Sequence, residues 1–262
     1  MNIIHRSSLK TKNGLSYFEI PEMAELEWIQ HAFLTRKGGM SLSPYDSLNV
    51  DGNNGDREED VCRNRDRIAA VFGLTHKRLI LLNQSHQDDI LLLKKPAEVL
   101  PPFLEYDAMI TDVPGMVLGI KTADCVPILI VDRKKSVIAA IHAGRQGTSL
   151  QITKKVLRQM EEEFDCLPEE LLIALGPSIG PCCYEIDEKV FRPGWEPFSV
   201  PKESGRWMVD LSEINIAQMK EEGIKENRIS RIDLCTSCHC DLFFSYRKEG
   251  QTGRQLSFIG IT

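Results

Sequence analysis

The sequence predicts an α+β fold, a mixed β-sheet sandwich flanked by helices. Short apolar, β-branched segments bounded by polar or turn residues outnumber the segments with helical periodicity. The two kinds do not alternate strictly along the chain, which argues against a doubly wound parallel sheet. No G-x-G-x-x-G follows a predicted strand and no P-loop is present, so the usual nucleotide-loop motifs of such sheets are missing as well.

Eight segments predict strands, because each is a short apolar run that ends at polar or turn residues. They are residues 79–82, 90–93, 116–120, 127–131, 137–141, 171–175, 229–233 and 256–261. All of them are far shorter than the roughly 20 apolar residues that a membrane-spanning helix needs. We therefore expect no membrane association.

Three segments predict helices. The charged stretch 56–67 alternates in sign and carries spaced apolar residues, which is typical of a surface helix. Thr148 and Gln151 form a T-x-x-Q capping box, and apolar residues follow at four-residue steps over 152–164. A weaker apolar pattern predicts the third helix at 212–222.

Length and charge limit the classes of function. The 262 residues contain no repeat, low-complexity tract or Gly/Ser linker, so we expect one domain over residues 1–262. A net charge of −6 is the opposite of the basic surface that nucleic-acid binders use. The N-terminal residues lack an apolar stretch of signal-peptide length, and we expect a cytoplasmic protein. Its eight cysteines are then reduced, and serve either packing or chemistry.

Three metal-capable residues lie at the ends of predicted strands, where rigid scaffolds present binding groups. His86 lies in NQSHQDD, Cys125 in KTADC, and His142 begins HAGRQGT. One thiolate and two imidazoles form a set of three protein ligands of the kind that holds catalytic zinc and leaves a fourth position open. Zinc in such a site lowers the pKa of a bound water to about 7. The long spacing between the three residues leaves a purely structural role open for each.

Charged residues near these segments extend the candidate site. Asp124, beside Cys125, is placed to accept an imidazole N–H or to shuttle a proton. Arg36 precedes Gly38-Gly39, and Arg247 and Arg254 flank a loop that contains glycine. Together the three guanidinium groups are candidates for binding an anion, although any one of them alone is more typical of an exposed surface arginine.

A second group of cysteines follows the predicted strand 229–233, in the sequence Cys235-Thr-Ser-Cys238-His-Cys240. C-x-x-C is half of a zinc ribbon, and a structural site needs a second pair. The only adjacent pair left is Cys182-Cys183, and neighbouring cysteines rarely bind one tetrahedral zinc. We therefore interpret this group as thiols without a metal.

Several segments together resemble the YfiH/YlmD family, whose members are named polyphenol oxidase (laccase-domain) or purine nucleoside phosphorylase proteins. The resemblance extends from about residue 33 to the end of the chain. The motifs that carry it are FLTRKGGMSLSPYDSLN, NQSH, KTADCVPILI, IHAG, GPSIGPCCYEI and DLCTSCHCDLFFSYR. It implies a zinc site formed by His86, Cys125 and His142, with copper as a substitute, and a fold similar to that of Cys/His-dependent toxin deamidases.

The activity implied by the resemblance is phosphorolysis of adenosine, inosine, guanosine and methylthioadenosine, which yields the free base and (methylthio)ribose 1-phosphate. Adenosine deamination at the same site is implied as well. We expect phosphorolysis to dominate, because the H-x-E motif that supplies a glutamate in classical zinc deaminases is absent. The expected partners are purine nucleosides and phosphate, and the sequence leaves the oligomeric state open.

The chain departs from the family pattern after the HAG histidine. The usual sequence there is HAG-Trp-Arg/Lys-Gly, whereas this chain has His142-Ala-Gly-Arg145-Gln-Gly. The basic residue is shifted by one position and the tryptophan is lost. Arg145 is therefore a further candidate for binding phosphate or substrate, either from a different angle or with a weaker contact.

Three alternatives remain beside this hypothesis. Cys125 as nucleophile and His142 as base would make a cysteine hydrolase or amidase, and metal analysis separates this from the zinc enzyme. A four-copper laccase centre is disfavoured, because the chain has six histidines and no H-x-H step. A non-enzymatic interaction module would keep its phenotype when His86 is mutated.

Overall fold

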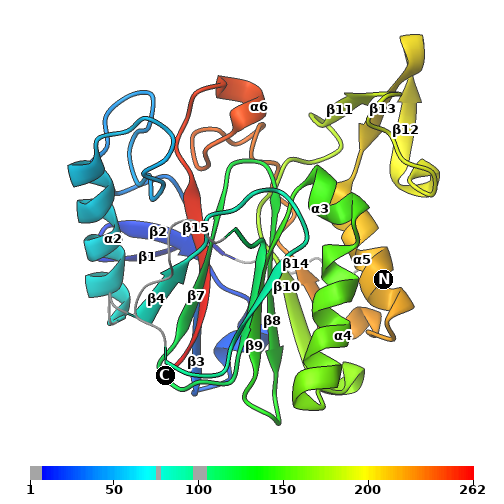
Figure 1. The fold of residues 1–262 in the computed structure, drawn as a ribbon. Coiled ribbons are helices and arrows are strands. Elements are labelled where there is room, and N and C mark those ends of the chain that lie inside the picture. The colour runs from blue at the N-terminus through cyan, green and yellow to red at the C-terminus, as the bar shows by residue number, and fades with distance from the viewer. Residues whose placement is uncertain (1–7, 75–77, 97–104) are drawn as a thin grey trace.

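The computed structural model describes residues 8–74, 78–96 and 105–262. Within these residues two six-stranded mixed sheets lie face to face, with helices on their outer faces (Figure 1). This confirms the predicted α+β sandwich. The first residues of the N-terminal segment, 1–7, in which no signal peptide was predicted, lie outside the described part.

The first sheet has the strand order β1-β2-β3-β15-β7-β4. Its C-terminal strand β15 pairs antiparallel with both β3 and β7, so the end of the chain lies in the middle of the sheet. The bounds are β1 Lys10–Lys12, β2 Leu15–Phe18, β3 Ile29–Leu34, β4 Leu79–Leu81, β7 Val117–Thr122 and β15 Gln255–Ile261.

The second sheet has the order β14-β10-β8-β9-β6-β5 and is built around the antiparallel pair β8 and β9. Its outer pairs, β10 with β14 and β5 with β6, are parallel. The bounds are β5 Ile90–Leu93, β6 Ala108–Thr111, β8 Val126–Asp132, β9 Ile138–Ala143, β10 Leu171–Leu175 and β14 Ile229–Arg231.

A small third sheet, in the order β11-β13-β12, projects beside one end of the sandwich (Figure 1). Its strands are β11 Glu185–Asp187, β12 Ser199–Lys202 and β13 Arg206–Val209. Short 3₁₀ turns occur at Pro168–Glu170, Glu196–Phe198, Glu203–Gly205 and Glu226–Arg228.

The helices complete four layers. Helix α2 (Glu58–Phe72) covers the outer face of the first sheet, and α4 (Ile152–Phe164) and α5 (Leu211–Glu221) cover the second (Figure 1). The shorter helices are α1 Pro21–Ala24, α3 Arg145–Ser149 and α6 Tyr246–Glu249. In the described residues no helix is both long and apolar enough to cross a membrane.

Strand β8 shows how the alternation of side chains builds these layers. Leu129 and Val131 point into the core between the two sheets, whereas Ile128 and Ile130 pack in the core beneath α4 and α5. All four are fully buried. Because both faces of the strand are covered, it appears in the sequence as a continuous apolar run rather than as an alternating one.

All eight predicted strands and the three predicted helices overlap observed elements, but the predicted helix cap is wrong. Gln151 has a left-handed backbone (φ 61°) and makes no capping bond. Thr148 lies in the preceding helix α3, where its hydroxyl accepts a hydrogen bond from Asn215 of α5. The apparent capping box therefore marks a break between two helices. The prediction of a single domain stays a prediction.

Candidate active site

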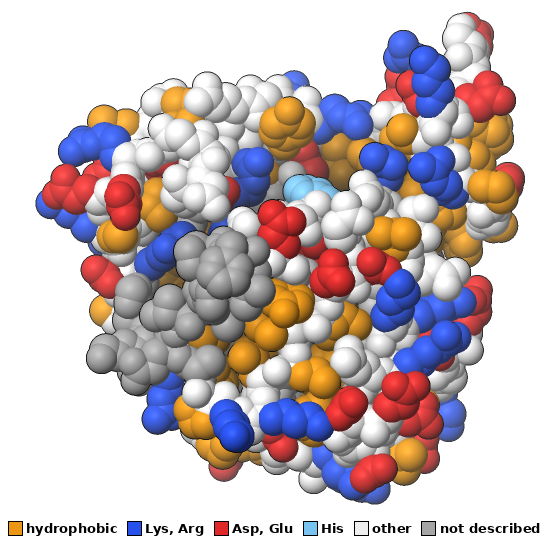
Figure 2. Space-filling model, in the orientation of Figure 1, with side chains coloured by type: hydrophobic (Ala, Val, Ile, Leu, Met, Phe, Trp, Pro, Cys, Tyr) orange, Lys and Arg blue, Asp and Glu red, His pale blue; other side chains and the backbone are white. Residues whose placement is uncertain are grey.

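The turn that connects β7 to β8 passes from the first sheet to the second and defines one end of the sandwich. Loops from both sheets and the starts of α3 and α5 surround a cavity of about 680 Å³ at this end. Figure 2 shows the hollow, with basic side chains on its rim and a histidine at its edge. The cavity therefore lies where the loops of both sheets meet.

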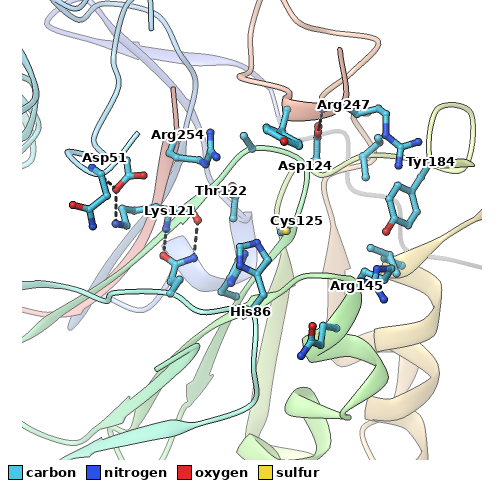
Figure 3. A pocket seen from close by; sticks show the side chains of 18 of the residues that line it. Asp51, His86, Lys121, Thr122, Asp124, Cys125, Arg145, Tyr184, Arg247 and Arg254 are labelled. Atoms are coloured by element: carbon cyan, nitrogen blue, oxygen red, sulfur yellow. Dashed lines mark hydrogen bonds and ion pairs between the residues drawn. The ribbon is translucent and has the colours of Figure 1, made fainter. Parts of the chain in front are cut away.

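His86, Cys125 and His142, which we call the Cys/His trio, all line this cavity; Figure 3 shows His86 and Cys125 in it. Their ligand atoms all lie within 4.8 Å of one another. His86 comes from the loop between β4 and β5, and its ring meets that of His142 edge to face, with 4.7 Å between the centroids. The strand-end reasoning thus selected three residues that the fold does bring together.

Strand pairing explains this convergence. In the β8–β9 pair Val126 is opposite Ala143, so Cys125 lies beside the end of β9 that carries His142. In the β6–β9 pair Ala108 is opposite Ile141, which brings Asp107 beside His142. The Asp107 carbonyl accepts the His142 backbone N–H at 2.7 Å.

Asp107, which sequence reasoning missed, organises the trio. One oxygen of its carboxylate lies 2.7 Å from His142 Nδ1, and its two oxygens accept backbone N–H groups of Ser85, His86 and Gln87 at 2.8–3.2 Å. Although burial opposes it, these bonds and the charge of His142 hold the pKa of Asp107 below its usual value. The carboxylate therefore fixes the loop that carries His86 and leaves Nε2 of His142 for Cys125.

Cys125 and His142 also influence each other's ionisation. Burial opposes charge on both groups, but their mutual attraction and hydrogen bonding lower the pKa of Cys125 and raise that of His142. The hydrogen bond from Asp107 raises the His142 pKa further. Without a metal, the two residues therefore favour a thiolate and an imidazolium at neutral pH.

Asp124 lines the cavity but does not take the role predicted for it beside an imidazole. Its backbone has a φ of 91°, and its carboxylate accepts the Thr236 hydroxyl at 2.7 Å and the Arg247 backbone N–H at 2.6 Å. Asp107, and not Asp124, accepts the imidazole N–H of His142. The two donors hold Asp124 in the left-handed turn that carries the chain from one sheet to the other.

Three of the four candidate arginines line the cavity: Arg145, Arg247 and Arg254 (Figure 3). The Arg247 guanidinium lies over the ring of Tyr184 and donates to the carbonyl of Glu185 at 2.9 Å. Arg254 donates to backbone carbonyls of its own loop. The half-buried Arg145 begins α3, and no described residue forms a hydrogen bond or an ion pair with its guanidinium.

The structure does not bring Arg36 to the cavity. Its buried guanidinium bonds to the carbonyls of Asp46 and Cys240 and pairs with Glu249 at 2.7 Å. It also lies 4.5 Å over the ring of Phe244. These contacts use the guanidinium to join two loops, so it is not directed at the cavity.

Three more lining residues were not selected from the sequence. Tyr184 lies next to Cys183 in GPCCYEI, and burial raises its pKa to about 12. Lys121 and Asp51 form a largely buried ion pair at 2.7 Å on the opposite wall. Lys121 could have been noticed as a charged residue at the end of an apolar strand. Its partner Asp51 lies 70 positions away in the sequence, so no local pattern predicts that the two residues pair.

Comparison with known proteins gives a consistent result. The family described as "Multi-copper polyphenol oxidoreductase laccase" matches residues 30–262. A purine nucleoside phosphorylase of Bacteroides thetaiotaomicron is 35% identical over 97% of this chain and 98% of its own length. The purine nucleoside phosphorylase YlmD of Bacillus subtilis is 30% identical over 100% of this chain and 99% of its own length.

Solved structures agree. The hypothetical protein YfiH of Bacillus licheniformis has a TM-score of 0.88 at 28% identity, covering 97% of this chain and 99% of that one. YlmD of Geobacillus stearothermophilus has a TM-score of 0.87 at 29% identity, covering 100% and 99%. The fold, the converging motifs and these matches show that the chain belongs to the YfiH/YlmD family of laccase-like domain proteins.

Proposed function

We propose that this protein is a zinc-dependent purine nucleoside phosphorylase that also deaminates adenosine at the same site. Its substrates would be adenosine, inosine, guanosine and methylthioadenosine, each cleaved by phosphate to the free base and (methylthio)ribose 1-phosphate. The observation that carries the proposal is the Cys/His trio in a cavity with three arginines on its walls. The names of the relatives point to the same reaction.

The trio fits a single zinc ion. One sulfur and two imidazole nitrogens are the donor types that zinc prefers, and their spacing within 4.8 Å suits one ion. The Asp107 carboxylate supplies the outer partner that a ligating histidine usually has. When bound, zinc would act as a Lewis acid and lower the pKa of a coordinated water, and a single copper ion could replace it.

The donor set does not fit a multi-copper oxidase centre. Such a cluster needs many histidines in one place, and among the described residues only His86 and His142 line the cavity. His31 lies in β3, where its ring accepts the backbone N–H of Ile20 at 2.9 Å. The described residues of the cavity therefore suit a single metal ion and not a copper cluster.

The cavity wall suits phosphate. No described carboxylate forms an ion pair with Arg145, Arg247 or Arg254, while the acidic Asp51 is already paired with Lys121. Backbone contacts fix the guanidinium groups of Arg247 and Arg254 in advance, and fixed guanidinium forks are effective ligands for phosphate oxygens. We assign phosphate to these three residues.

In phosphorolysis, a phosphate oxygen attacks C1′ of the ribose while the bond from C1′ to the purine nitrogen breaks. The arginines would hold the nucleophile and offset charge as the bond breaks. The departing purine takes the electron pair and needs a hydrogen-bond donor. Tyr184 is protonated at neutral pH, like any tyrosine with a pKa of about 10 or higher, and burial raises its pKa further, to about 12. Its hydroxyl is our candidate donor.

In deamination, water adds at C6 of adenine and ammonia leaves, so a proton must move from the water to the leaving amine. Asp124 is our proposed carboxylate for this transfer. Each of its oxygens accepts one hydrogen bond, which leaves a second lone pair on each to take a proton. We expect deamination to be slower than phosphorolysis, because the glutamate of the H-x-E motif in classical zinc deaminases is absent.

The test is an assay of zinc-loaded protein with adenosine or inosine, with and without phosphate. We expect ribose 1-phosphate and free base only when phosphate is present, and inosine from adenosine in either case. Cys125→Ala should abolish both products, whereas Cys62→Ala, which changes an exposed cysteine on α2, should abolish neither. Absence of ribose 1-phosphate with every nucleoside would refute the proposal.

One observation favours a second candidate, a cysteine hydrolase or amidase. Cys125, His142 and Asp107 have the order of a nucleophile, its base and the carboxylate that orients the base. Zinc bound through Cys125 would occupy the nucleophile, so metal content separates the two candidates. A metal-free enzyme that cleaves amides and is inactivated by iodoacetamide would reverse our preference.

A further inference from the structure

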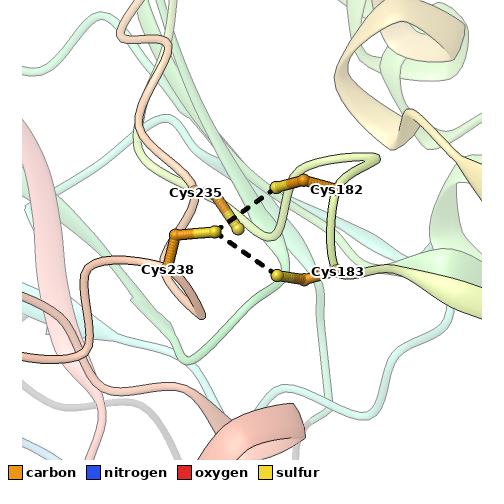
Figure 4. Close-up of side chains that lie close together, drawn as sticks. All are labelled: Cys182, Cys183, Cys235 and Cys238. Atoms are coloured by element: carbon orange, nitrogen blue, oxygen red, sulfur yellow. Dashed lines mark hydrogen bonds between the residues drawn. The ribbon is translucent and has the colours of Figure 1, made fainter.

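Four cysteines outside the Cys/His trio form a second group, which we call the sulfur cluster. Their sulfurs all lie within 4.8 Å of one another, and Cys238 Sγ is 3.5 Å from one neighbour and 3.4 Å from another. Figure 4 shows the four side chains converging from two segments of the chain. The members are Cys182, Cys183, Cys235 and Cys238.

We propose that the sulfur cluster binds one structural Zn²⁺ through four thiolates. Four sulfurs at the zinc–sulfur distance of about 2.3 Å lie about 3.8 Å apart at the corners of a tetrahedron. The observed spacing is close to this arrangement. The site shares no ligand with the Cys/His trio and does not depend on the proposed activity.

The backbone around Cys182 and Cys183 removes the objection that adjacent cysteines cannot bind the same ion. The N–H groups of Cys183 and Tyr184 both bond to the carbonyl of Gly180 at 3.0 Å. This tight turn brings both side chains toward the cysteines of the other segment (Figure 4). Our interpretation of these residues as unrelated thiols did not anticipate a turn of this kind.

The other segment is shaped in the same way. The His239 N–H bonds to the Cys235 carbonyl at 3.0 Å, which closes a turn around the C-x-x-C sequence. The Gly180 N–H donates to the Cys235 sulfur at 3.2 Å, which links the two segments directly at the cluster. A Cβ at Gly180 would lie only 3.3 Å from Cys235 Cβ, so glycine allows the two segments this close approach.

The close spacing of the four sulfurs favours a bound cation. Four neighbouring thiolates repel one another, and a divalent cation offsets that repulsion while displacing the thiol protons.

The proposed ion would join two segments that form one wall of the cavity. Ser178 and Cys235 form a bridge between them, and the Thr236 hydroxyl bonds to Asp124 at 2.7 Å. Tyr184, which lines the cavity, follows Cys183 directly. The zinc would therefore fix Tyr184 and Asp124 in place without touching the substrate.

The decisive experiment counts zinc in a protein whose Cys/His trio has been removed. In Cys125→Ala/His142→Ala we expect one zinc per chain after dialysis, measured by elemental mass spectrometry. Adding Cys182→Ser or Cys238→Ser, each at an exposed position, should remove it. Adding Cys240→Ser, which lies in the same motif but outside the cluster, should leave one zinc.

A second measurement needs no change in the cluster. Cobalt(II) added to zinc-free Cys125→Ala/His142→Ala protein should produce the thiolate-to-metal absorption of a tetrahedral four-sulfur site. No bound zinc and no cobalt spectrum would overturn the proposal. So would a disulfide between two of the four cysteines, located by peptide mass mapping of the unreduced protein. Neither result bears on the phosphorolysis assay.

Discussion

Asp107 positions more of the site than any residue chosen from the sequence, because its carboxylate contacts both the His142 ring and the backbone of the loop that carries His86. Asp107→Asn keeps the shape but replaces an acceptor oxygen by a donor. Loss of such an outer partner typically weakens metal binding by about 10–100-fold. We expect that loss in zinc affinity, measured by competition with a chelator, together with a lower kcat.

The matched control is Asp89→Asn, which changes an exposed aspartate near the same loop and should leave the zinc affinity unchanged. Unaltered zinc affinity in Asp107→Asn would show that the carboxylate does not support the metal site.

Arg145 is the cavity arginine whose guanidinium no described residue engages, so it is the freest to bind phosphate. Arg145→Met should raise the KM for phosphate by about 10–100-fold, because charge-assisted hydrogen bonds contribute about 1.5–3 kcal/mol. Deamination needs no phosphate and should keep its rate. Steady-state kinetics of the two reactions on one preparation provide the measurement.

The comparison variant is Arg158→Met, on the exposed face of α4 and paired there with Glu222. It should leave the phosphate KM unchanged. Equal phosphate KM values for Arg145→Met and the unaltered protein would remove Arg145 from the substrate site and leave its basic side chain without a role.

At the scale of elements, the sequence is most informative where a segment is buried on both faces. The apolar runs of β8 and β9 are fully buried. The chemically active residues found at the ends of these two runs in the sequence are Cys125 and His142, which belong to the Cys/His trio. Strand β6 was not recognised from the sequence, and Asp107, which directly precedes it, was missed together with it.

Contacts between loops far apart in the sequence could not be predicted. Cys182 meets Cys238 because β10 and β14 are neighbours in one sheet, and no local pattern encodes that. Arg36 likewise resembled an anion ligand beside two glycines, but its partner Glu249 comes from the far end of the chain. Long side chains reach several partners, so their targets depend on the folded arrangement.

His31 connects β3 to the start of α1 through its bond to the Ile20 N–H. Burial, assisted by the charge of Lys10, lowers its pKa to about 4. The unfolded chain, with a histidine pKa of about 6.5, therefore binds the proton first as the pH falls. The contribution of neutral His31 to the free energy of unfolding is therefore fully present above about pH 6.5 and is lost as the pH falls from 6.5 to 4. Between pH 7.5 and pH 5 this loss should be about 2 kcal/mol.

Urea unfolding of the unaltered protein and His31→Gln at pH 7.5 and 5 measures this contribution. The difference between the two proteins cancels the other titrating groups, so His31→Gln should lose about 2 kcal/mol less than the unaltered protein on acidification. Equal losses in both would mean that His31 is protonated in the folded state at pH 5.

At the scale of the whole molecule, the cavity is lined by loops of both sheets, so its shape depends on how closely the two sheets approach each other. Gly176, at the end of β10, faces Phe33 of β3 in the other sheet, and a Cβ at Gly176 would lie 2.2 Å from that ring. Phe33 is fully buried, so a Cβ at Gly176 would force a shift within the packed core. Gly176 therefore sets the distance between the sheets.

Gly176→Ala should destabilise the protein by at least 1–3 kcal/mol, roughly the cost of overpacking a core, and should also raise KM because the loops of both sheets line the cavity. Urea unfolding and nucleoside kinetics give the two readouts. Gly52→Ala is the control, since a Cβ there meets nothing within 4 Å, and it should change neither. If Gly176→Ala matched Gly52→Ala in stability, the sheets would have room to separate and their close approach would not define the cavity.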